Sequence, residues 1–440
     1  MIATGPEVAG GSATGLLINR FEDLLFEAGF PGLACASFGA RTSVVAQTPH
    51  LQAVRDVGAG VAAPLLYSFV RWVAEDAGAK GIRRLHFVAR DGDTLRLIAK
   101  ACRDIRETTD LMLLHGSRQS WHLAGLDIRE TARQTWLTEH AERLTVRQFL
   151  ERVGLTPDDV PRHDKADDLL GAEGVARMLE VLERPAVRAV LQRQVELRRH
   201  QVRRYLHQEG VSNQHRSAFV DLGWTGRMFS SLHTVFGEAR DSLPPVYLFG
   251  LVRVEAVQGD YRAWLFDVES VKDVPVHRVA AALETFCLTD SGHTVGYNED
   301  RSGLVTPVQK YGHDPAALRW GSDTLKQAII RFTEEAGTAA ALDRQTAIDL
   351  LKRFWYHPEP TEATAWGDAP YEDDQQGLLE RRLARPSDWS EATRYLRDRS
   401  VPWASACWPA GARLRTPTAI RLLVQLAVKS GWITSPPEPL

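Results

Sequence analysis

The sequence predicts an α/β protein with a parallel sheet, a helical insertion and a mostly helical C-terminal region. Three observations lead to this fold class. Short apolar runs of strand length alternate with stretches of helical periodicity. A polar side chain follows each of three such runs, at a turn or at the start of a helix. No convincing strand occurs between residues 120 and 210, where the pattern is helical.

The first of these strands lies at residues 85–89, after a buried helix over 57–76. The apolar run breaks at Asp91-Gly92, and helical spacing resumes over 94–106. Asp91 and Asp93 therefore follow the C-terminal end of a central strand, where open α/β sheets bind ligands. One of the two carboxylates can attack or bind metal while the other transfers a proton. Taken alone, the segment is best explained as a polar turn, and the polar ends of the other strands weaken that explanation.

Two further strands end in polar residues. The strand at 111–115 precedes Ser117 and Arg118, and the strand at 217–220 precedes Asp221. Ser117 alone is best explained as a helix N-cap. Asp221 opens a Gly-containing turn before a helix over 229–236, whose backbone N–H groups suit an anion or a metal-bound phosphate. A fourth strand is predicted at 246–254.

The region between residues 120 and 210 is predicted to contain several helices. They lie at about 129–140, 145–153, 172–182 and 185–209. The last one is rich in arginine. It is either a solvated helix face or an electropositive wall toward an anionic substrate. Nucleic-acid binding would depend on this helix alone, which is a weak signal.

The predicted organisation has four parts. They are an N-terminal extension (1–50), an α/β core (51–118 and 211–300), a cap-like helical insertion (119–210) and a helical C-terminal region (301–440). The last part is rich in tryptophan, and these residues suggest a second packing unit there: Trp355, Trp366, Trp389, Trp403 and Trp408. The oligomeric state is left open.

Composition narrows the classes of function. The 440 residues carry a net charge of -3, which gives no global field for nucleic acid. The four cysteines form no CxxC pair, which suits a reducing compartment. No signal pattern is seen, and the longest uncharged run, residues 57–70, is too short to span a bilayer. We therefore expect a cytoplasmic protein.

Four phrases resemble one protein family. They are FVARDGDTL, GSRQSW, FVDLGWTGRM and LETFCLTDSGHTVGY, spread over about residues 50 to 300. Their order resembles the haloacid dehalogenase (HAD)-like superfamily, in particular the ARDG / VDxGWxG group found in bacterial polysaccharide biosynthesis clusters. The resemblance implies a Rossmann-like sheet and a Mg²⁺-dependent hydrolase, a phosphatase or phosphotransferase. Its substrate would be a phosphorylated sugar, a nucleotide-sugar or a biosynthetic intermediate.

The resemblance also implies roles for individual residues. Asp91 would be the nucleophile that forms an aspartyl-phosphate, and Asp93 would be the general acid and base. Ser117 would bind a phosphoryl oxygen. Metal binding would fall to Asp91, Asp221 and the backbone carbonyl of Asp93. Arg118, Trp224 and His293 are plausible substrate contacts, although packing or surface roles explain each of these three equally well.

The chain departs from the family pattern at several points. Leu95 stands where Thr or Val is usual, and Asp221 lacks a second acid at the usual offset. The family pattern also has a lysine in its third motif, between the positions of Ser117 and Asp221. Lys165 is the only lysine in this interval, and Arg204 or Arg216 could take its place.

In many members of the family, the residue that corresponds to Asp93 is not acidic. The acid at this position here therefore favours catalysis. The alternatives are a catalytically degenerate HAD-like binding or scaffold protein, or a transferase that reuses the same pocket, in a polysaccharide or natural-product pathway.

Overall fold

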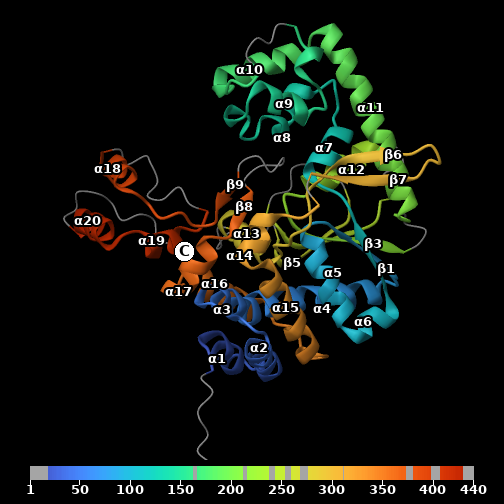
Figure 1. The fold of residues 1–440 in the computed structure, drawn as a ribbon. Coiled ribbons are helices and arrows are strands. Elements are labelled where there is room, and N and C mark those ends of the chain that lie inside the picture. The colour runs from blue at the N-terminus through green and yellow to red at the C-terminus, as the bar shows by residue number, and fades with distance from the viewer. Residues whose placement is uncertain are drawn as a thin grey trace, which may run out of the picture.

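The computed structural model confirms an α/β fold organised around one five-stranded parallel sheet (Figure 1). The structure describes residues 18–161, 166–211, 216–236, 243–252, 259–267, 276–310, 312–372, 380–397 and 407–429. Residues 1–14 are rich in Gly, Ala, Ser and Thr, a composition that predicts disorder, and they lie outside these ranges, as does Lys165.

The sheet has the strand order β2-β1-β3-β4-β5. Its strands are β1 (Arg84–Val88), β2 (Asp110–Leu114), β3 (Ser217–Trp224), β4 (Val246–Leu251) and β5 (Tyr261–Phe266). Every neighbouring pair is parallel, so all five carboxyl ends lie at one edge of the sheet. The chain winds outward from β1 first to β2 and then, on its other side, to β3. The crevice that such a reversal leaves at the carboxyl ends is where open α/β sheets bind ligands.

Side chains that alternate along the strands enter two different cores. In β3, Ala218, Val220 and Leu222 belong to the larger cluster, which contains α4 (Ala63–Ala79), α5 (Asp91–Ala101) and α13 (Val276–Phe286). Phe219 instead packs with α7 (Arg118–Ala124), α11 (Pro185–Gln208) and α12 (Arg227–Phe236). Both faces of the sheet are thus covered by helices, which explains why its strands are continuous apolar runs rather than alternating ones.

The strand predictions are correct in position for the first four strands, but three features were missed. The sequence analysis overlooked β5 and two antiparallel pairs, β6 (Thr294–Glu299) with β7 (Val305–Gln309), and β8 (Pro370–Glu372) with β9 (Glu380–Arg382). These strands are short or mostly half-exposed, so they lack a strong apolar run. The helix after β1 also begins earlier than predicted, because Asp91 and Asp93 occupy its first turn rather than a preceding loop.

The helix predicted at 57–76 is part of a longer helical run, Pro49–Ala79. It consists of α3 (Pro49–Val57), a π-helical turn at Gly58–Ala62, and α4. Within the described residues, it is the one helix long and apolar enough to cross a membrane by length and composition. However, 83% of its most apolar window is buried inside the protein, as expected for a core helix.

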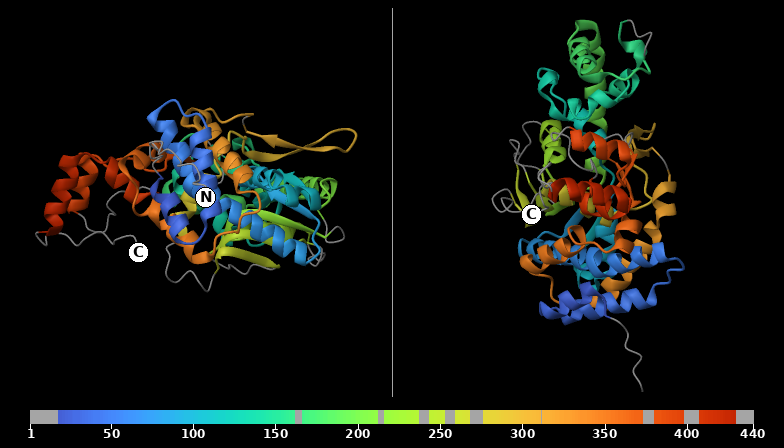
Figure 2. Two further views of the ribbon diagram at one scale, coloured as in Figure 1. Left: turned by 90° about the horizontal axis from the view of Figure 1, so that it is seen from below. Right: turned by 90° about the vertical axis from the view of Figure 1, so that its left-hand side faces the viewer.

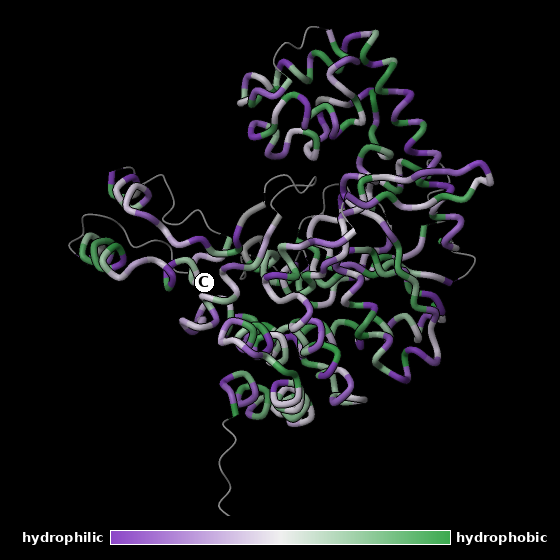
Figure 3. The backbone as a smooth tube through the Cα atoms, in the orientation of Figure 1, coloured by the Kyte–Doolittle hydropathy of each residue, from purple (hydrophilic) through white to green (hydrophobic). Residues whose placement is uncertain are grey.

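The insertion has a hydrophobic core of its own, built from residues between Leu123 and Val195. It stands away from the sheet in the right-hand view of Figure 2. Its main helices are α9 (Val146–Arg152), α10 (Gly171–Leu182) and α11, close to the predicted bounds. The continuous helix predicted at 129–140 is wrong. A 3-10 turn (Thr131–Arg133) and the short α8 (Thr135–Thr138) stand there instead, because the segment lacks a sustained apolar stripe. Hydrophilic and hydrophobic residues alternate along the insertion in Figure 3.

The N-terminal helices and most of the C-terminal helices complete the larger core, whereas Ala392, Ile420, Val424 and Ala427 near the end of the chain form a small cluster of their own. The N-terminal helices are α1 (Arg20–Glu27) and α2 (Pro31–Ser43). The C-terminal ones are α14 (Pro315–Trp320), α15 (Ser322–Ala336), α16 (Arg344–Trp355), α17 (Pro360–Gly367), α18 (Trp389–Arg397), α19 (Pro409–Arg415) and α20 (Thr418–Lys429). Trp355, Trp366 and Trp408 share one cluster with the sheet, so these three do not form the separate packing unit predicted for them. Trp389 is exposed, and Trp403 lies outside the described residues.

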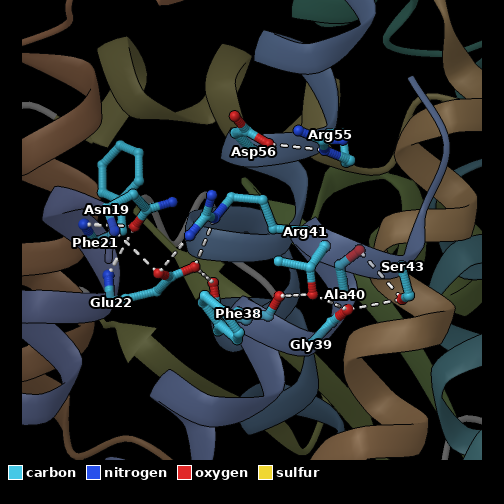
Figure 4. Close-up of polar contacts among 12 residues, drawn as sticks. Asn19, Phe21, Glu22, Phe38, Gly39, Ala40, Arg41, Ser43, Arg55 and Asp56 are labelled. Atoms are coloured by element: carbon cyan, nitrogen blue, oxygen red, sulfur yellow. Dashed lines mark hydrogen bonds and ion pairs between the residues drawn. The ribbon is translucent and has the colours of Figure 1, made fainter. Parts of the chain in front are cut away.

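A buried ion pair joins α1 to α2 (Figure 4). The Glu22 side chain is 1% exposed and accepts two hydrogen bonds from Arg41, at 2.9 and 3.0 Å. Ser37 Oγ and the Asn19 backbone N–H donate to the same carboxylate. Because all these donors converge on it, the charge of Glu22 is compensated in a buried place, which fixes the packing of the two helices.

Candidate functional site

A cavity of about 550 Å³ lies at the carboxyl ends of the central strands. It is lined by Asp91 after β1, by Ser117 and Arg118 after β2, and by Asp221 and Trp224 in the last residues of β3. Residues from distant segments complete the wall, among them His122, Glu139, Arg227, Glu284, His293, Asp314, Arg319 and Tyr371. The fold therefore brings together the polar ends of three strands that the sequence identified.

Asp91 is the first residue of α5 and faces two other acids. Burial raises the pKa of its carboxyl group well above the ordinary value, and the charges of Glu284 and Asp221 raise it further. The positive charges of Arg90 and Arg118 act in the opposite direction. Burial and the neighbouring acids therefore disfavour the charged form of Asp91, and a positive charge beside it, such as Arg118, is what favours the carboxylate.

Asp221 lies within β3, at the same edge of the sheet. Burial raises the pKa of its carboxyl group to about 7, although backbone hydrogen bonds from Gly223 and Leu222 oppose the shift. The Gly223 N–H donates to Asp221 Oδ2 at 3.2 Å. The position of Asp221 is thus fixed by the turn that follows it.

Glu284 is the site residue that the sequence analysis did not assign. It comes from α13 and accepts a hydrogen bond from Trp224 Nε1 at 3.1 Å. Tyr371 of β8 also donates to its side chain. Burial raises the pKa of Glu284, while Arg118 and Arg90 favour its charged form. The available signal was an acid within an otherwise apolar helical stretch, where a buried charge needs a partner.

The three carboxyl groups of Asp91, Asp221 and Glu284 fit a divalent cation in kind and charge. Oxygen donors are the ligands that Mg²⁺ prefers, and a cation would relieve their mutual repulsion. Among the described residues, no three His, Cys, Asp or Glu side chains are close enough together to hold a metal ion. The three groups would therefore have to draw together around one.

Asp93 does not belong to the cavity wall. Its Oδ2 accepts a hydrogen bond from Ser291 Oγ at 2.8 Å. Helical geometry explains this, because residues two apart on a helix do not point in the same direction. Both carboxylates were expected to reach the substrate because residues i and i+2 of a turn can do so. The segment is not a turn, however, since α5 already begins at Asp91. The acid–base role of Asp93 stays a prediction.

Ser117 is both a cavity residue and the N-cap of α7. Its Oγ accepts from the Ser120 N–H at 3.0 Å and donates to the Thr294 carbonyl at 2.6 Å. The capping role considered from the sequence is thus present, and the hydroxyl proton is engaged with β6. Phosphoryl binding by Ser117 stays a prediction that requires this bond to exchange.

The three expected substrate contacts, Arg118, Trp224 and His293, all line the cavity. Arg118 is exposed, and its charge favours the ionised forms of the three acids. The indole N–H of Trp224 donates a hydrogen bond to Glu284. This bond gives Trp224 a positioning contact within the site, which does not exclude stacking on a ligand.

The C-terminal end of β3 has an unusual backbone. Gly223 has φ +104° and the next residue, Trp224, has φ +86°. A positive φ is rare for a bulky residue and is found mostly where the surrounding structure enforces it, often at functional sites. Here it directs the indole N–H of Trp224 toward Glu284. Local strain thus contributes to assembling the acidic wall.

His122 makes the fold sensitive to acid. It is buried, stacks on Trp136 with ring centroids 5.4 Å apart, and contacts Ser231 Oγ through Nδ1 at 2.9 Å. Burial, followed by the charges of Arg118, Arg227 and Arg152, lowers its pKa from 6.5 to about 3. The unfolded chain therefore binds a proton that the folded chain rejects. Stability is complete above pH 6.5 and falls by up to about 1.4 kcal/mol per pH unit below it.

We expect the free energy of unfolding to drop by about 2 kcal/mol more between pH 7 and pH 5 in the wild type than in His122→Phe. Phenylalanine keeps the ring stack on Trp136 but cannot take up a proton. Urea titrations at the two pH values measure the difference. Equal drops in the two proteins would show that His122 does not titrate on unfolding.

No protein-family model matches the chain, and no curated protein matches it.

Proposed function

We propose that the protein is a Mg²⁺-dependent, HAD-like phosphohydrolase or phosphotransferase with a Rossmann-like core. Its substrate would be a phosphorylated sugar, a nucleotide-sugar or a related biosynthetic intermediate. One observation carries the proposal: Asp91 and Asp221, from strand ends far apart in sequence, line one cavity together with Arg118. Acidic groups for attack and a guanidinium for the phosphoryl oxygens are the parts that phosphoryl transfer requires.

Asp91 acts as the nucleophile in this proposal. Its carboxylate forms a bond to phosphorus while the bond from phosphorus to the leaving oxygen breaks. This yields an aspartyl-phosphate and the dephosphorylated product. Water, or an acceptor hydroxyl in the transferase case, then attacks phosphorus and restores the carboxylate. Arg118 binds the phosphoryl oxygens, whose charge its guanidinium complements in planar geometry.

Asp91, Asp221 and Glu284 would hold the Mg²⁺ ion. The bound ion would offset the repulsion between the attacking carboxylate and the anionic phosphoryl group. Glu284 supplies the second acid that does not follow Asp221 in the sequence, because α13 brings it to the same cavity. Trp224 and Tyr371 orient Glu284 through their hydrogen bonds.

The leaving oxygen needs a proton, for which we propose Asp93. To deliver it, the Asp93 carboxyl has to exchange its bond with Ser291 for one with the substrate. The same contact supports the second candidate function, a binding protein without turnover. In that case Asp93 would remain on Ser291, and the cavity would only retain a phosphorylated ligand.

Phosphate release from sugar phosphates, nucleotides and aryl phosphates, measured with Mg²⁺ and with EDTA, tests the proposal. We expect metal-dependent turnover with at least one of these substrates. We also expect Asp93→Asn to lower kcat by about 10²-fold or more, because general acid–base catalysis contributes about that much.

Asp110→Asn is the matched control, since Asp110 is an exposed acid at the opposite edge of the sheet. This variant is expected to keep full activity. If no substrate turns over but one still raises the melting temperature, the binding protein is the better description. Turnover that is equal in EDTA would contradict the metal requirement.

A further inference from the structure

A second cavity, of about 890 Å³, lies where the insertion meets the core. Its wall comes from the segment after α7, from α8, from one face of α11 and from α12. In Figure 1 these elements meet at the base of the insertion. The polar side chains that line it include Asp127, Arg129, Glu130, Arg133, Gln134, Thr135, Gln192, Glu196, Arg199, Ser230, Ser231 and Thr234.

Two residues, His122 and Arg227, line both cavities. Arg227 begins α12 and reaches across to the insertion. Its Nη2 atom contacts both Glu139 oxygens at 3.2 Å, and its Nη1 atom donates to Thr135 Oγ1 at 3.2 Å. Glu139 is 47% exposed, and an ion pair at such a place contributes only about 0–1 kcal/mol. Arg227 can therefore exchange Glu139 for an anionic ligand group at little cost.

The charges of the second cavity are already balanced. Arg129 pairs with Asp127, and Arg133 pairs with Glu130. Arg199 is further inside and donates to two backbone carbonyls. A second anionic group entering here would meet the carboxylates of Asp127, Glu130 and Glu196.

An uncharged, hydroxyl-rich ligand fits the second cavity better. The side chains of Gln134 and Gln192 each carry both donors and acceptors, as do the hydroxyls of Thr135, Ser231 and Thr234. Sugar hydroxyl groups need both kinds of partner. The paired carboxylates and guanidiniums offer further acceptors and donors without any change of net charge.

Size points in the same direction. Pockets for small molecules usually span about 300–1,000 Å³, so each of the two cavities is large enough for a ligand group of its own. The first cavity alone has room for a phosphorylated monosaccharide. Because His122 and Arg227 stand in both walls, the two cavities are neighbours, and a longer molecule could occupy both if it passed Arg227.

We propose that the second cavity binds an uncharged saccharide unit of a phosphorylated substrate, with Arg227 contacting its anionic part at the junction. This assignment rests on the proposed function, because the phosphoryl group is placed at Asp91. It narrows the substrate class to a phosphorylated saccharide of more than one unit, whose terminal phosphoryl group enters the first cavity.

Calorimetric titration with four probes tests the assignment. The probes are trehalose 6-phosphate, glucose 6-phosphate, inorganic phosphate and trehalose. We expect trehalose 6-phosphate to bind at least tenfold more tightly than glucose 6-phosphate. In Gln192→Leu we expect this preference to shrink at least threefold, with the affinities for glucose 6-phosphate and inorganic phosphate unchanged.

Gln345→Leu is the matched control. Both glutamines are exposed and bond an acid four residues later on their helix: Gln192 bonds Glu196 at 3.0 Å, and Gln345 bonds Asp349 at 2.9 Å. Only Gln192 lines the cavity, so Gln345→Leu should keep the full preference.

Equal affinities for the mono- and disaccharide phosphates, or a preference that survives in Gln192→Leu, would overturn the assignment. A failure of the proposed function gives a different result. In that case neither inorganic phosphate nor glucose 6-phosphate binds, while trehalose still binds in a Gln192-dependent way.

Discussion

Asp91→Asn is expected to abolish phosphate release, by roughly three orders of magnitude or more in kcat, while the protein becomes no less stable. An amide cannot attack phosphorus to form an aspartyl-phosphate, so the proposed covalent step is lost. At the same time, the substitution removes one of three mutually repelling acids from a buried wall. Loss of activity without loss of stability is the pattern expected of a group that serves function at the expense of the fold.

Initial rates on the best substrate and a thermal melt without metal measure the two effects together. The shape of asparagine is nearly that of aspartate, so the cavity should be preserved. Asp110→Asn again provides the reference for both measurements. Residual turnover within tenfold of wild type would exclude Asp91 as the nucleophile. A large fall in melting temperature would show that the Asp91 carboxylate has a structural partner.

Gly223→Ala is expected to destabilise the protein by about 3 kcal/mol or more and to disrupt the acidic wall. Gly223 has φ +104°, which an alanine adopts only with strain. A Cβ atom there would also meet the Gly250 carbonyl oxygen of the neighbouring strand, and backbone yields less readily than a side chain. Because Asp221 and Trp224 are positioned by this turn, ligand binding should weaken as well.

Gly78→Ala is the control for the second prediction. Gly78 lies in α4, is exposed, and has open space where a Cβ would be added. Replacing a helical glycine of this kind should stabilise the protein by about 0.5–1 kcal/mol. Chemical denaturation of both variants measures the contrast. If Gly223→Ala were as stable as wild type, the positive φ at this turn would not be required by the fold.

The central strands and their polar ends were predictable because each has a local signature. A strand buried on both faces is an apolar run of five or so residues, and the residue that follows it is polar. Asp91, Ser117 and Asp221 were found in this way, and all three line one cavity. The rule that parallel strands present their carboxyl ends at one edge was sufficient to group them.

The residues that were missed or misplaced depend on distant parts of the chain. Glu284 becomes a site residue because Trp224 and Tyr371, from two other segments, donate to it. Asp93 is drawn out of the wall by Ser291 and by the early start of α5. A motif spacing gives the order of side chains along the backbone but not the direction in which each one points.

The sequence by itself thus determined the α/β class, the four central strands of the sheet and the edge at which its polar residues gather. Only the tertiary structure decided which acids share the cavity, that Arg227 also lines a second one, and that Trp355, Trp366 and Trp408 pack in the core of the sheet. The physical reason is the range of the interactions. The apolar pattern of a helix or strand lies within a short stretch of sequence, so it can be recognised there. The convergence of buried charges depends on contacts between segments far apart in the chain, which no local pattern records.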